Sequence, residues 1–148
     1  MKSMLGLMGF MALACMSATP VSHAAQVVSS VNTGECVHRP RGFTPDGTPI
    51  FLFHCHGVPN EQWSIANGQI TASGGMCLDV QGSVPTEGAP VIIVACNGRP
   101  SQAWSILKGQ IIGVGGKCLD ASGGSLSDHT PLIISSCSSS PTQQWSVQ

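Results

Sequence analysis

The side chains with the greatest chemical capacity in this 148-residue chain are carboxylates, imidazoles and thiols. Asp79 and Asp120 each follow a cysteine by two residues and lie 41 positions apart. A carboxylate pair works as general acid and base only when both groups flank one bond. Asp79 and Asp120 belong to separate copies of a repeat, which places them far apart, and the chain has no G-x-S-x-G nucleophile motif or phosphate-binding glycine loop. We therefore expect no enzymatic activity and no cofactor.

The imidazoles gather in one part of the sequence. His54 and His56 flank Cys55, and His38 lies two residues after Cys36. Such a group could bind a transition metal or respond to pH. On a strand, residues that flank a cysteine point away from its disulfide, whereas a residue two positions away shares its side. His38 should thus lie on the opposite face from the other two, and we predict surface histidines without a metal ion.

A repeat of 41 residues organises the chain and must position these groups. It is marked by the tryptophans Trp63, Trp104 and Trp145, by the cysteines Cys36, Cys77 and Cys118, by Cys55, Cys96 and Cys137, and by the prolines Pro49, Pro90 and Pro131. Three copies, at about 25–66, 67–107 and 108–148, fill nearly the whole chain after residue 24. Periods of this length are typical of solenoids, propellers or closed repeat folds.

The segments inside each repeat favour strands. Short β-branched or aromatic runs follow the prolines at 49, 90 and 131, and such runs are typical of strands. Asn67-Gly68 and Lys108-Gly109 stand where a two-residue hairpin turn is expected. No apolar stripe of helical period appears, and a propeller needs about four or more blades. The sequence predicts a closed three-fold β-structure.

The cysteines indicate disulfides, because no C-x₂-C spacing typical of zinc sites is present. Six cysteines after residue 24 allow 15 pairings, and three-fold symmetry makes pairs within each repeat the simplest choice. These pairs, each 19 residues apart, are Cys36–Cys55, Cys77–Cys96 and Cys118–Cys137. A loop of this size stabilises by roughly 3 kcal/mol in the chain-entropy model. Disulfides also indicate an oxidising compartment.

The first 24 residues have the pattern of an export signal. Lys2 precedes an apolar run, and Ser22-His23-Ala24 suits cleavage before Ala25. The run is shorter than the about 20 residues that span a bilayer, and no later segment is longer. Residues 12–15 also resemble a bacterial lipoprotein box, so lipidation of Cys15 remains an alternative. We expect a secreted or periplasmic protein with no transmembrane segment.

The composition excludes several classes of protein. Charged residues make up 9% of the chain and the formal net charge is −1, whereas a typical soluble domain has roughly 25% charged residues. Coiled coils and helical bundles need more Glu, Lys and Ala. Nucleic-acid binding normally needs a basic patch, which is not visible here. The 42% hydrophobic content argues against disorder.

With the repeat laid out, residues 25–148 resemble the ricin B-chain type β-trefoil lectins. The resemblance is carried in the second repeat by Cys77-Leu78-Asp79, Gly82, Cys96-Asn97-Gly98 and Gln102-Ala103-Trp104, in the third by Cys118-Leu119-Asp120, Gly123 and Gln143-Gln144-Trp145, and in the first by Cys36, Gly47, Gly57 and Glu61-Gln62-Trp63. It implies an all-β β-trefoil with pseudo-three-fold symmetry and up to three shallow sites for galactose-type or related glycans and polysaccharides.

The resemblance also implies roles for single residues. In the family, an Asp accepts hydrogen bonds from vicinal sugar hydroxyls, an aromatic residue stacks on the sugar ring, and a Gln with the residue before it completes the site. The matching positions hold Asp79 and Gln102 in the second repeat, Asp120 and Gln143 in the third, and His38, Phe53, Asn60 and Glu61 in the first. No repeat holds a complete set. The three tryptophans are expected in the core.

Two alternatives stay open at this stage. The Gln and Asp residues could hold turns by bonding local backbone groups instead of binding sugar. The run Val91-Ile92-Ile93-Val94 is apolar on both faces, so Ile92 and Val94, if turned outward, would form a patch for a protein partner. The chain would then be a docking or toxin-targeting subunit with degenerate sugar sites.

Overall fold

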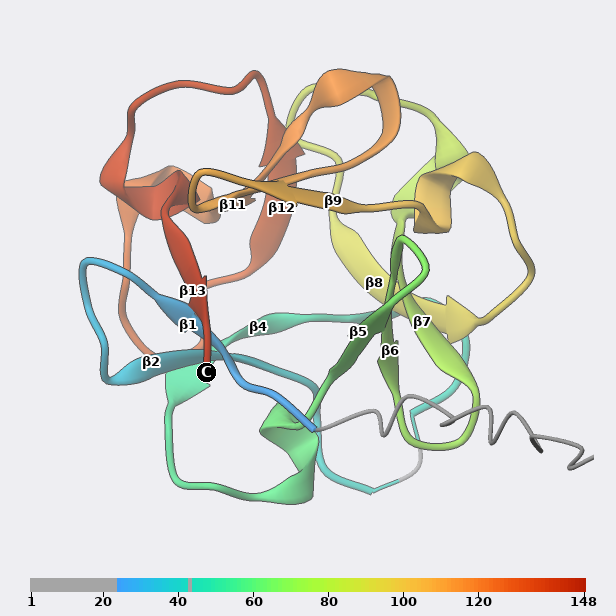
Figure 1. Ribbon diagram of the computed structural model, residues 1–148, viewed down its shortest axis with the longest axis horizontal. Coiled ribbons are helices and arrows are strands. Elements are labelled where there is room, and N and C mark those ends of the chain that lie inside the picture. Colours follow the sequence, from blue (N-terminus) through green and yellow to red (C-terminus); the bar gives the residue numbers. More distant parts are fainter. Residues whose placement is uncertain (1–23, 43) are drawn as a thin grey trace, which may run out of the picture.

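The computed structural model describes residues 24–42 and 44–148 (Figure 1). The predicted signal peptide lies outside the described residues except for Ala24, and so does Cys15. The described part of the chain contains strands and single 3₁₀ turns but no α-helix. No helix in these two ranges has the length and apolar character needed to cross a membrane.

The elements follow the repeat. The first third holds β1 (Val27–Ser29), β2 (Glu35–His38), β3 (Thr48–Pro49), β4 (Phe51–His54) and the 3₁₀ turn η1 (Pro59–Glu61). The second third holds β5 (Ser64–Ala66), β6 (Gln69–Ala72), β7 (Met76–Val80), η2 (Gln81–Ser83), β8 (Val91–Ala95) and η3 (Pro100–Gln102). The last third holds β9 (Ser105–Leu107), β10 (Gln110–Ile112), η4 (Val114–Gly116), β11 (Cys118–Ala121), η5 (Ser122–Gly124), β12 (Leu132–Ser135), η6 (Pro141–Gln143) and β13 (Trp145–Val147).

Three antiparallel sheets form, each around the disulfide-linked segment of one repeat, and two of them also contain a strand from another third of the chain. Their strand orders are β13-β1-β2-β4, β3-β8-β7-β6-β5 and β12-β11-β10-β9. The last strand, β13, pairs with the first, β1, and so closes the molecule. In Figure 1 the blue, green-to-yellow and orange-to-red thirds surround a common centre. The predicted all-β fold with three-fold pseudosymmetry is confirmed.

The hairpins form where the sequence places residues that accept a left-handed backbone. Asn67 and Gly68, between β5 and β6, have φ of 53° and 72°. Lys108 and Gly109, between β9 and β10, have φ of 50° and 78°. Two successive positive φ values match the two-residue turn whose twist suits a hairpin.

The three tryptophans pack in the common centre of the repeats, and each is at least 95% buried. Their indole N–H groups donate to equivalent carbonyls, those of Val37, Leu78 and Leu119, at 3.0, 2.9 and 3.0 Å. A buried indole needs such a partner, because an unpaired buried N–H costs about 1–3 kcal/mol. Each tryptophan therefore joins the core to the strand that carries the first cysteine of its own repeat, namely β2, β7 or β11.

The predicted pattern of one disulfide per repeat is confirmed. The pairs are Cys36–Cys55, Cys77–Cys96 and Cys118–Cys137, with Cα–Cα distances of 5.2, 4.9 and 5.0 Å. Each bridge ties the strand that carries the candidate Asp or His to the segment just after the neighbouring strand. The disulfides thus help to position the candidate sites.

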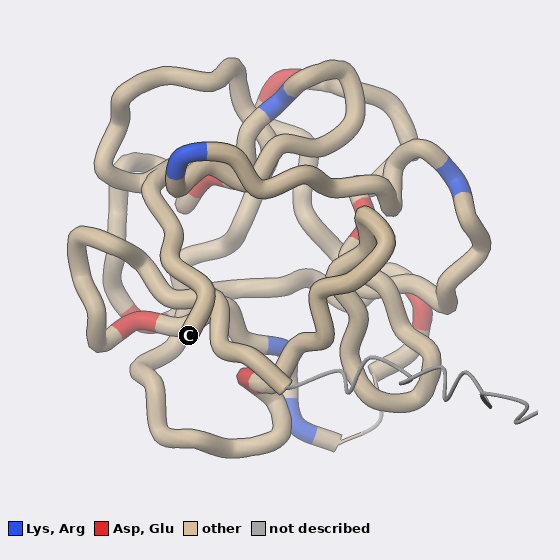
Figure 2. The backbone as a smooth tube through the Cα atoms, viewed as in Figure 1, with Lys and Arg blue, Asp and Glu red and all other residues tan. Residues whose placement is uncertain are grey.

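A ring of three carboxylates joins each repeat to the next, and we call it the carboxylate clamp (Asp46, Glu87 and Asp128). Asp46 accepts the backbone N–H of Ala95 at 2.8 Å, and Glu87 accepts that of Ser136 at 2.9 Å. Asp128 completes the ring by accepting the N–H of His54 at 2.7 Å. Figure 2 shows that charged residues are otherwise few and dispersed over the molecule.

The expectation that Ile92 faces outward is wrong. Ile92 is 7% exposed, and Val94 is half-buried. The reason is a pairing between repeats: β3 of the first repeat adds to the free edge of β8, with Pro49 opposite Ile92. Residues directly opposite each other on antiparallel strands share one face of the sheet, so Pro49 covers Ile92 from the added strand.

Candidate functional site

Each repeat brings its candidate residues together in one local arrangement. The residue two positions after the first cysteine lies on a strand, beside a residue from the 3₁₀ turn of the same repeat. The platform residue lies on the next strand, opposite the cysteine, as for Cys36 with Phe53, Cys77 with Val94 and Cys118 with Ser135. The three copies differ in which groups occupy these positions.

In the second repeat, Asp79 and Gln102 form a closed polar pair. Gln102 Nε2 donates to Asp79 Oδ2 at 3.0 Å and to the Ala95 carbonyl at 3.1 Å, while Gln102 Oε1 accepts the Asn97 N–H. The other carboxylate oxygen of Asp79 accepts the Val80 N–H at 2.7 Å. Asp79 is 3% exposed and Gln102 is 1% exposed. Both carboxylate oxygens are therefore engaged by the protein itself.

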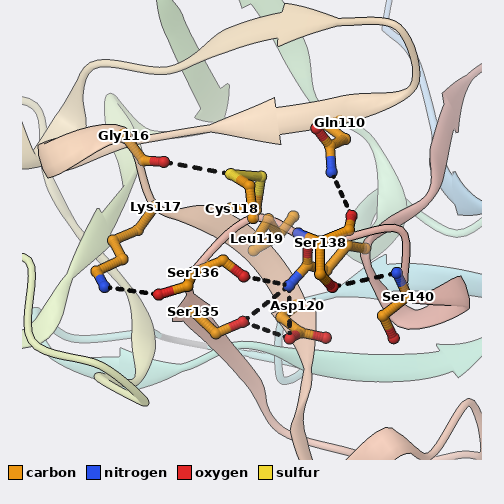
Figure 3. The surroundings of a disulfide bond; sticks show 12 residues. Gln110, Gly116, Lys117, Cys118, Leu119, Asp120, Ser135, Ser136, Ser138 and Ser140 are labelled. Carbon is orange, nitrogen blue, oxygen red and sulfur yellow. Dashed lines mark hydrogen bonds between the residues drawn. A yellow bond between two sulfur atoms is a disulfide. The ribbon is translucent and has the colours of Figure 1, made fainter.

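In the third repeat, Asp120 is more open. Gln143 Nε2 donates to Asp120 Oδ2 and to the Ser136 carbonyl, both at 3.0 Å, and Ser135 Oγ donates to the same carboxylate oxygen (Figure 3). Asp120 Oδ1 has no hydrogen-bond partner, and the residue is half-buried. Unlike Asp79, Asp120 therefore retains an acceptor that the protein does not use.

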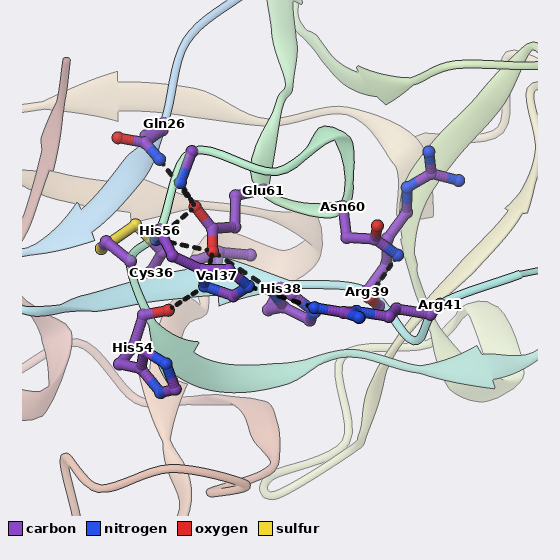
Figure 4. Close-up of polar contacts among 12 residues, drawn as sticks. Gln26, Cys36, Val37, His38, Arg39, Arg41, His54, His56, Asn60 and Glu61 are labelled. Atoms are coloured by element: carbon purple, nitrogen blue, oxygen red, sulfur yellow. Dashed lines mark hydrogen bonds and ion pairs between the residues drawn. A yellow bond between two sulfur atoms is a disulfide. The ribbon is translucent and has the colours of Figure 1, made fainter.

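In the first repeat, the carboxylate stands on the 3₁₀ turn instead of the strand. Glu61 is 0% exposed and accepts the backbone N–H groups of His56 at 3.1 Å and Gly57 at 2.9 Å. The side-chain amide of Gln26 donates to it at 2.7 Å, and His56 Nδ1 lies 2.8 Å from it (Figure 4). A buried carboxylate is tolerated when N–H donors surround it, and Glu61 meets this condition.

His38 occupies the strand position that holds Asp in the other repeats. Its Nδ1 lies 3.7 Å from Glu61 Oε1, beyond a hydrogen bond, and has no other partner. Burial lowers the pKa of His38 because the charged imidazolium loses its hydration, and this outweighs the opposite effect of Glu61. The first repeat thus carries a neutral imidazole where the others carry a carboxylate.

The predicted separation of His38 from His56 is wrong. Their rings are nearly parallel, with centroids 6.0 Å apart, and both lie near Glu61. His56 lies beyond the end of β4, where the alternation of side chains along a strand no longer applies. Among the described residues, no group of three or more His, Cys, Asp and Glu is arranged to hold a metal ion.

Phe53, the predicted platform, lies within a cluster of aromatic rings and is half-buried. Its ring centroid lies 4.3 Å from that of His54, 5.1 Å from His129, 5.2 Å from His38 and 5.7 Å from His56. Phe53 is thus the one platform position of the three with an aromatic ring, and imidazoles surround it.

Asn60 is engaged in the local loop. Its side-chain amide donates to the carbonyls of Arg39 at 3.2 Å and Pro40 at 2.9 Å. These bonds hold the chain that leaves β2 against η1. Asn60 therefore has a structural task at the position where the resemblance implied a sugar ligand.

The sequence reasoning missed His129, which lies against Phe51 and Phe53. Its φ is 66°, and the equivalent residues of the other repeats, Gly47 and Gly88, have φ of 89° and 79°. A side chain in this left-handed region costs about 1 kcal/mol relative to glycine. The 41-residue spacing from Gly88 to His129 was the signal that could have identified it, and the same spacing relates the three residues of the carboxylate clamp.

The family model of the ricin-type beta-trefoil lectin domain matches residues 24–145. The match covers most of the chain, and the chain therefore belongs to this family. The β-trefoil fold follows from it and agrees with the three sheets and three equivalent disulfides described above.

Solved structures agree with this assignment. The designed three-fold symmetric protein ThreeFoil is 26% identical, with a TM-score of 0.75 over 84% of this chain and 96% of that one. The agglutinin from Abrus precatorius is 23% identical, with a TM-score of 0.72 over 88% of this chain and 51% of that one. The ricin B-like lectin of Macrolepiota procera, solved with lactose, is 16% identical, with a TM-score of 0.71 over 89% and 99%.

Proposed function

We propose that this protein is an exported, non-catalytic lectin that binds neutral, galactose-type sugars through its third repeat. The observation that carries the proposal is the unpartnered Oδ1 of Asp120, at the position where the family places its hydroxyl acceptor. An unsatisfied buried acceptor costs about 1–3 kcal/mol, and a sugar hydroxyl that displaced the surrounding groups slightly would satisfy it. The lectin of Macrolepiota procera, with its bound lactose, supports the choice of sugar class.

The second repeat has a different role in this proposal. Both oxygens of Asp79 accept hydrogen bonds from the protein, and the residue is buried. Asp79 and Gln102 therefore stabilise the loop that follows β8 rather than bind a ligand. Because the active repeat also lacks an aromatic platform, we expect weak binding of single sugars and useful affinity only for multivalent ligands.

The proposal of export rests on the export-signal pattern of residues 1–24 described above. Cleavage before Ala25 would preserve the pairing of Ala25 with Trp63, whose backbone groups exchange two hydrogen bonds of 2.8 Å. The intact mass of the protein recovered from the exported fraction tests this proposal. A mass that begins at Ala25 supports it, whereas a lipid-modified mass that begins at Cys15 supports anchoring.

The experiment that tests sugar binding is a glycan array with residues 25–148, oxidised and displayed multivalently. We expect binding to galactose-terminated glycans that free galactose competes away. Asp120→Asn should lower this binding by about tenfold or more. Asp79→Asn is the matched control, because it alters an equivalent Asp–Gln bond and should cost about 1–3 kcal/mol of stability without lowering sugar binding.

Two outcomes would contradict the proposal. If Asp120→Asn and Asp79→Asn bind as the native protein does, the sugar does not use Asp120. If the array is silent with a folded, disulfide-bonded sample, the alternative of docking onto a protein gains weight. The buried Ile92 leaves only the half-buried Val94 of the surface first expected for such a partner.

A further inference from the structure

At the sugar-binding position, the first repeat has an imidazole in place of the carboxylate found in the other two repeats. The second and third repeats present an acceptor there, Asp79 and Asp120, whereas the first presents His38. Its carboxylate, Glu61, is fully buried and already bonded to N–H groups of His56, Gly57 and Gln26. The position thus has no free carboxylate to receive the hydroxyl hydrogens of a neutral sugar.

The side chains that face outward near this position include those of Arg41 and His56. His56 Nδ1 lies 2.7 Å from the His54 carbonyl and 2.8 Å from Glu61 Oε1. Since both neighbours only accept, Nδ1 carries the proton, and Nε2 accepts from Arg41 Nη2 across 3.5 Å (Figure 4). This contact is long, and the exposed guanidinium of Arg41 keeps further N–H groups that an incoming anion can engage.

An aromatic surface lies beside Arg41 and His56. Phe53 is half-buried, and the His56 and His129 rings meet it edge-on, with centroids 5.7 and 5.1 Å away. His129 is exposed and adopts a φ of 66° at a position that is glycine in the other two repeats. Strained residues of this kind concentrate at functional sites, and here the side chain extends the ring surface beside Phe53.

The nearby carboxylates determine at which end of the Phe53 ring surface an anion can bind. Asp128 bonds His54 through both its oxygens, at 2.7 and 3.1 Å, and Glu35 lies beside Asp128. The carboxylate of Asp128 therefore places a negative charge at the His54 end of this surface. Arg41 and His56 lie at the other end, where Glu61 is the carboxylate in contact and is enclosed by its own donors.

We propose that Arg41, Phe53, His56 and His129, which we call the first-repeat face, bind an anionic sugar. The ring of the sugar stacks on Phe53, and its carboxylate or sulfate group accepts from the Arg41 guanidinium beside His56. Guanidinium groups are well suited to both anions, because two parallel N–H donors match two oxygens. The inference rests on the proposed lectin function but uses a different repeat and a different ligand charge.

The test is a binding titration with the full exported domain and three soluble oligosaccharides. These are an oligogalacturonide for the carboxylate, a sulfated galactan oligosaccharide for the sulfate, and a neutral galacto-oligosaccharide. We expect at least one anionic probe to bind about tenfold more tightly than the neutral one. The better of the two anionic probes identifies the charged group.

Three variants separate a built site from general attraction of charge. Arg41→Gln and His129→Gly should each weaken anionic binding about fivefold or more, and His129→Gly should melt at the same or a higher temperature because the strain is relieved. Arg99→Gln removes one exposed positive charge outside the face and should leave anionic binding unchanged. A structural role of His129 alone predicts no loss of binding.

The proposal is overturned if neither anionic probe binds better than the neutral one, if Arg99→Gln weakens binding as much as Arg41→Gln, or if His129→Gly binds normally. Failure of the proposed function is distinguishable from these results. It appears as absent binding of the neutral galactoside, which depends on Asp120 and not on Arg41.

Discussion

At the scale of single residues, the three repeats use side chains of different charge to accept equivalent backbone N–H groups. The loop after the second cysteine needs an acceptor for its backbone N–H groups, and Gln102, Gln143 and Glu61 each supply it. A glutamine can also donate to an Asp on the neighbouring strand. A glutamate cannot, so the first repeat carries a neutral, buried His38 there instead of an Asp.

The burial of His38 makes the stability of the protein depend on pH. Its pKa is lowered in the folded state, chiefly by burial, from an ordinary value of 6.5. Below that value the unfolded chain binds a proton more readily than the folded one, so the free energy of unfolding falls as the pH drops. We expect His38→Gln to show a smaller loss between about pH 7.5 and pH 5 than the native protein. Chemical denaturation at several pH values measures it, and parallel curves for the two proteins would contradict it.

Because Asp79 and Gln102 are buried and bonded to each other, we expect a carboxylate in place of the Gln102 amide to destabilise the fold. Gln102→Glu would place two buried carboxylates about 3 Å apart, since Gln102 Nε2 now lies 3.0 Å from Asp79 Oδ2. We expect a loss of about 2–4 kcal/mol at neutral pH, partly recovered in acid when the two groups share a proton. Gln81→Glu, at an exposed position, is the control and should change stability by less than about 0.5 kcal/mol. Equal effects of the two substitutions would show that the pair is unimportant.

At the scale of elements, the sequence predicted the structural features that lie within a single repeat. The spacing of tryptophans and cysteines sufficed for the repeat and the disulfides, and Asn67-Gly68 marked a hairpin. The sequence patterns did not predict the contacts between repeats. Ile92 is buried because a two-residue strand around Pro49 pairs with β8, and so short a strand has no periodicity to recognise. Likewise, His56 meets His38 because it lies beyond the end of β4, where the chain no longer follows the alternation of a strand.

The carboxylate clamp is the element-scale feature most open to test. The pKa of Glu87 is lowered to about 2, first by the hydrogen bond from Lys117 and then by the backbone N–H of Ser136. A carboxylate with a lowered pKa stabilises the fold above the unfolded value of 4.5, and this contribution is lost as the pH falls toward 2. We expect Glu87→Gln to be less stable at neutral pH and to lose less stability between these values. Urea denaturation across this range measures it, and an unchanged acid profile would contradict it.

At the scale of the whole molecule, closure by β13 makes the last residues part of the core. Trp145 is 3% exposed and its strand pairs with β1 from Val27 to Ser29. The centre of the fold therefore receives one tryptophan from each repeat, and the third arrives only when the chain is complete. This arrangement makes the domain a single cooperative unit rather than a stack of independent repeats.

A chain that ends at Gln144 tests this cooperativity. It lacks Trp145 and the partner of β1, and loss of a core tryptophan alone costs about 3–5 kcal/mol of a total near 5–15 kcal/mol. We expect no cooperative thermal transition and loss of the near-ultraviolet circular dichroism. A chain ending at Val147 is the control and should still unfold cooperatively. A sharp transition in the shorter chain would mean that β13 and Trp145 are not needed for cooperative folding.

The pairing of β1 with β13 also bears on the order in which the repeats are connected. Gln26 and Gln148 exchange two backbone hydrogen bonds, of 2.8 and 2.9 Å, so the first and last strands of the β-trefoil meet. A circular permutant opened at Asn67-Gly68 and joined from Gln148 to Ala25 would trace the same strands around the same centre. Which repeat comes first is thus arbitrary for the architecture. At the candidate sites the repeats differ through exchanges such as Glu61 for glutamine and His129 for glycine, and in the functions proposed above these exchanges decide which ligand a repeat could bind.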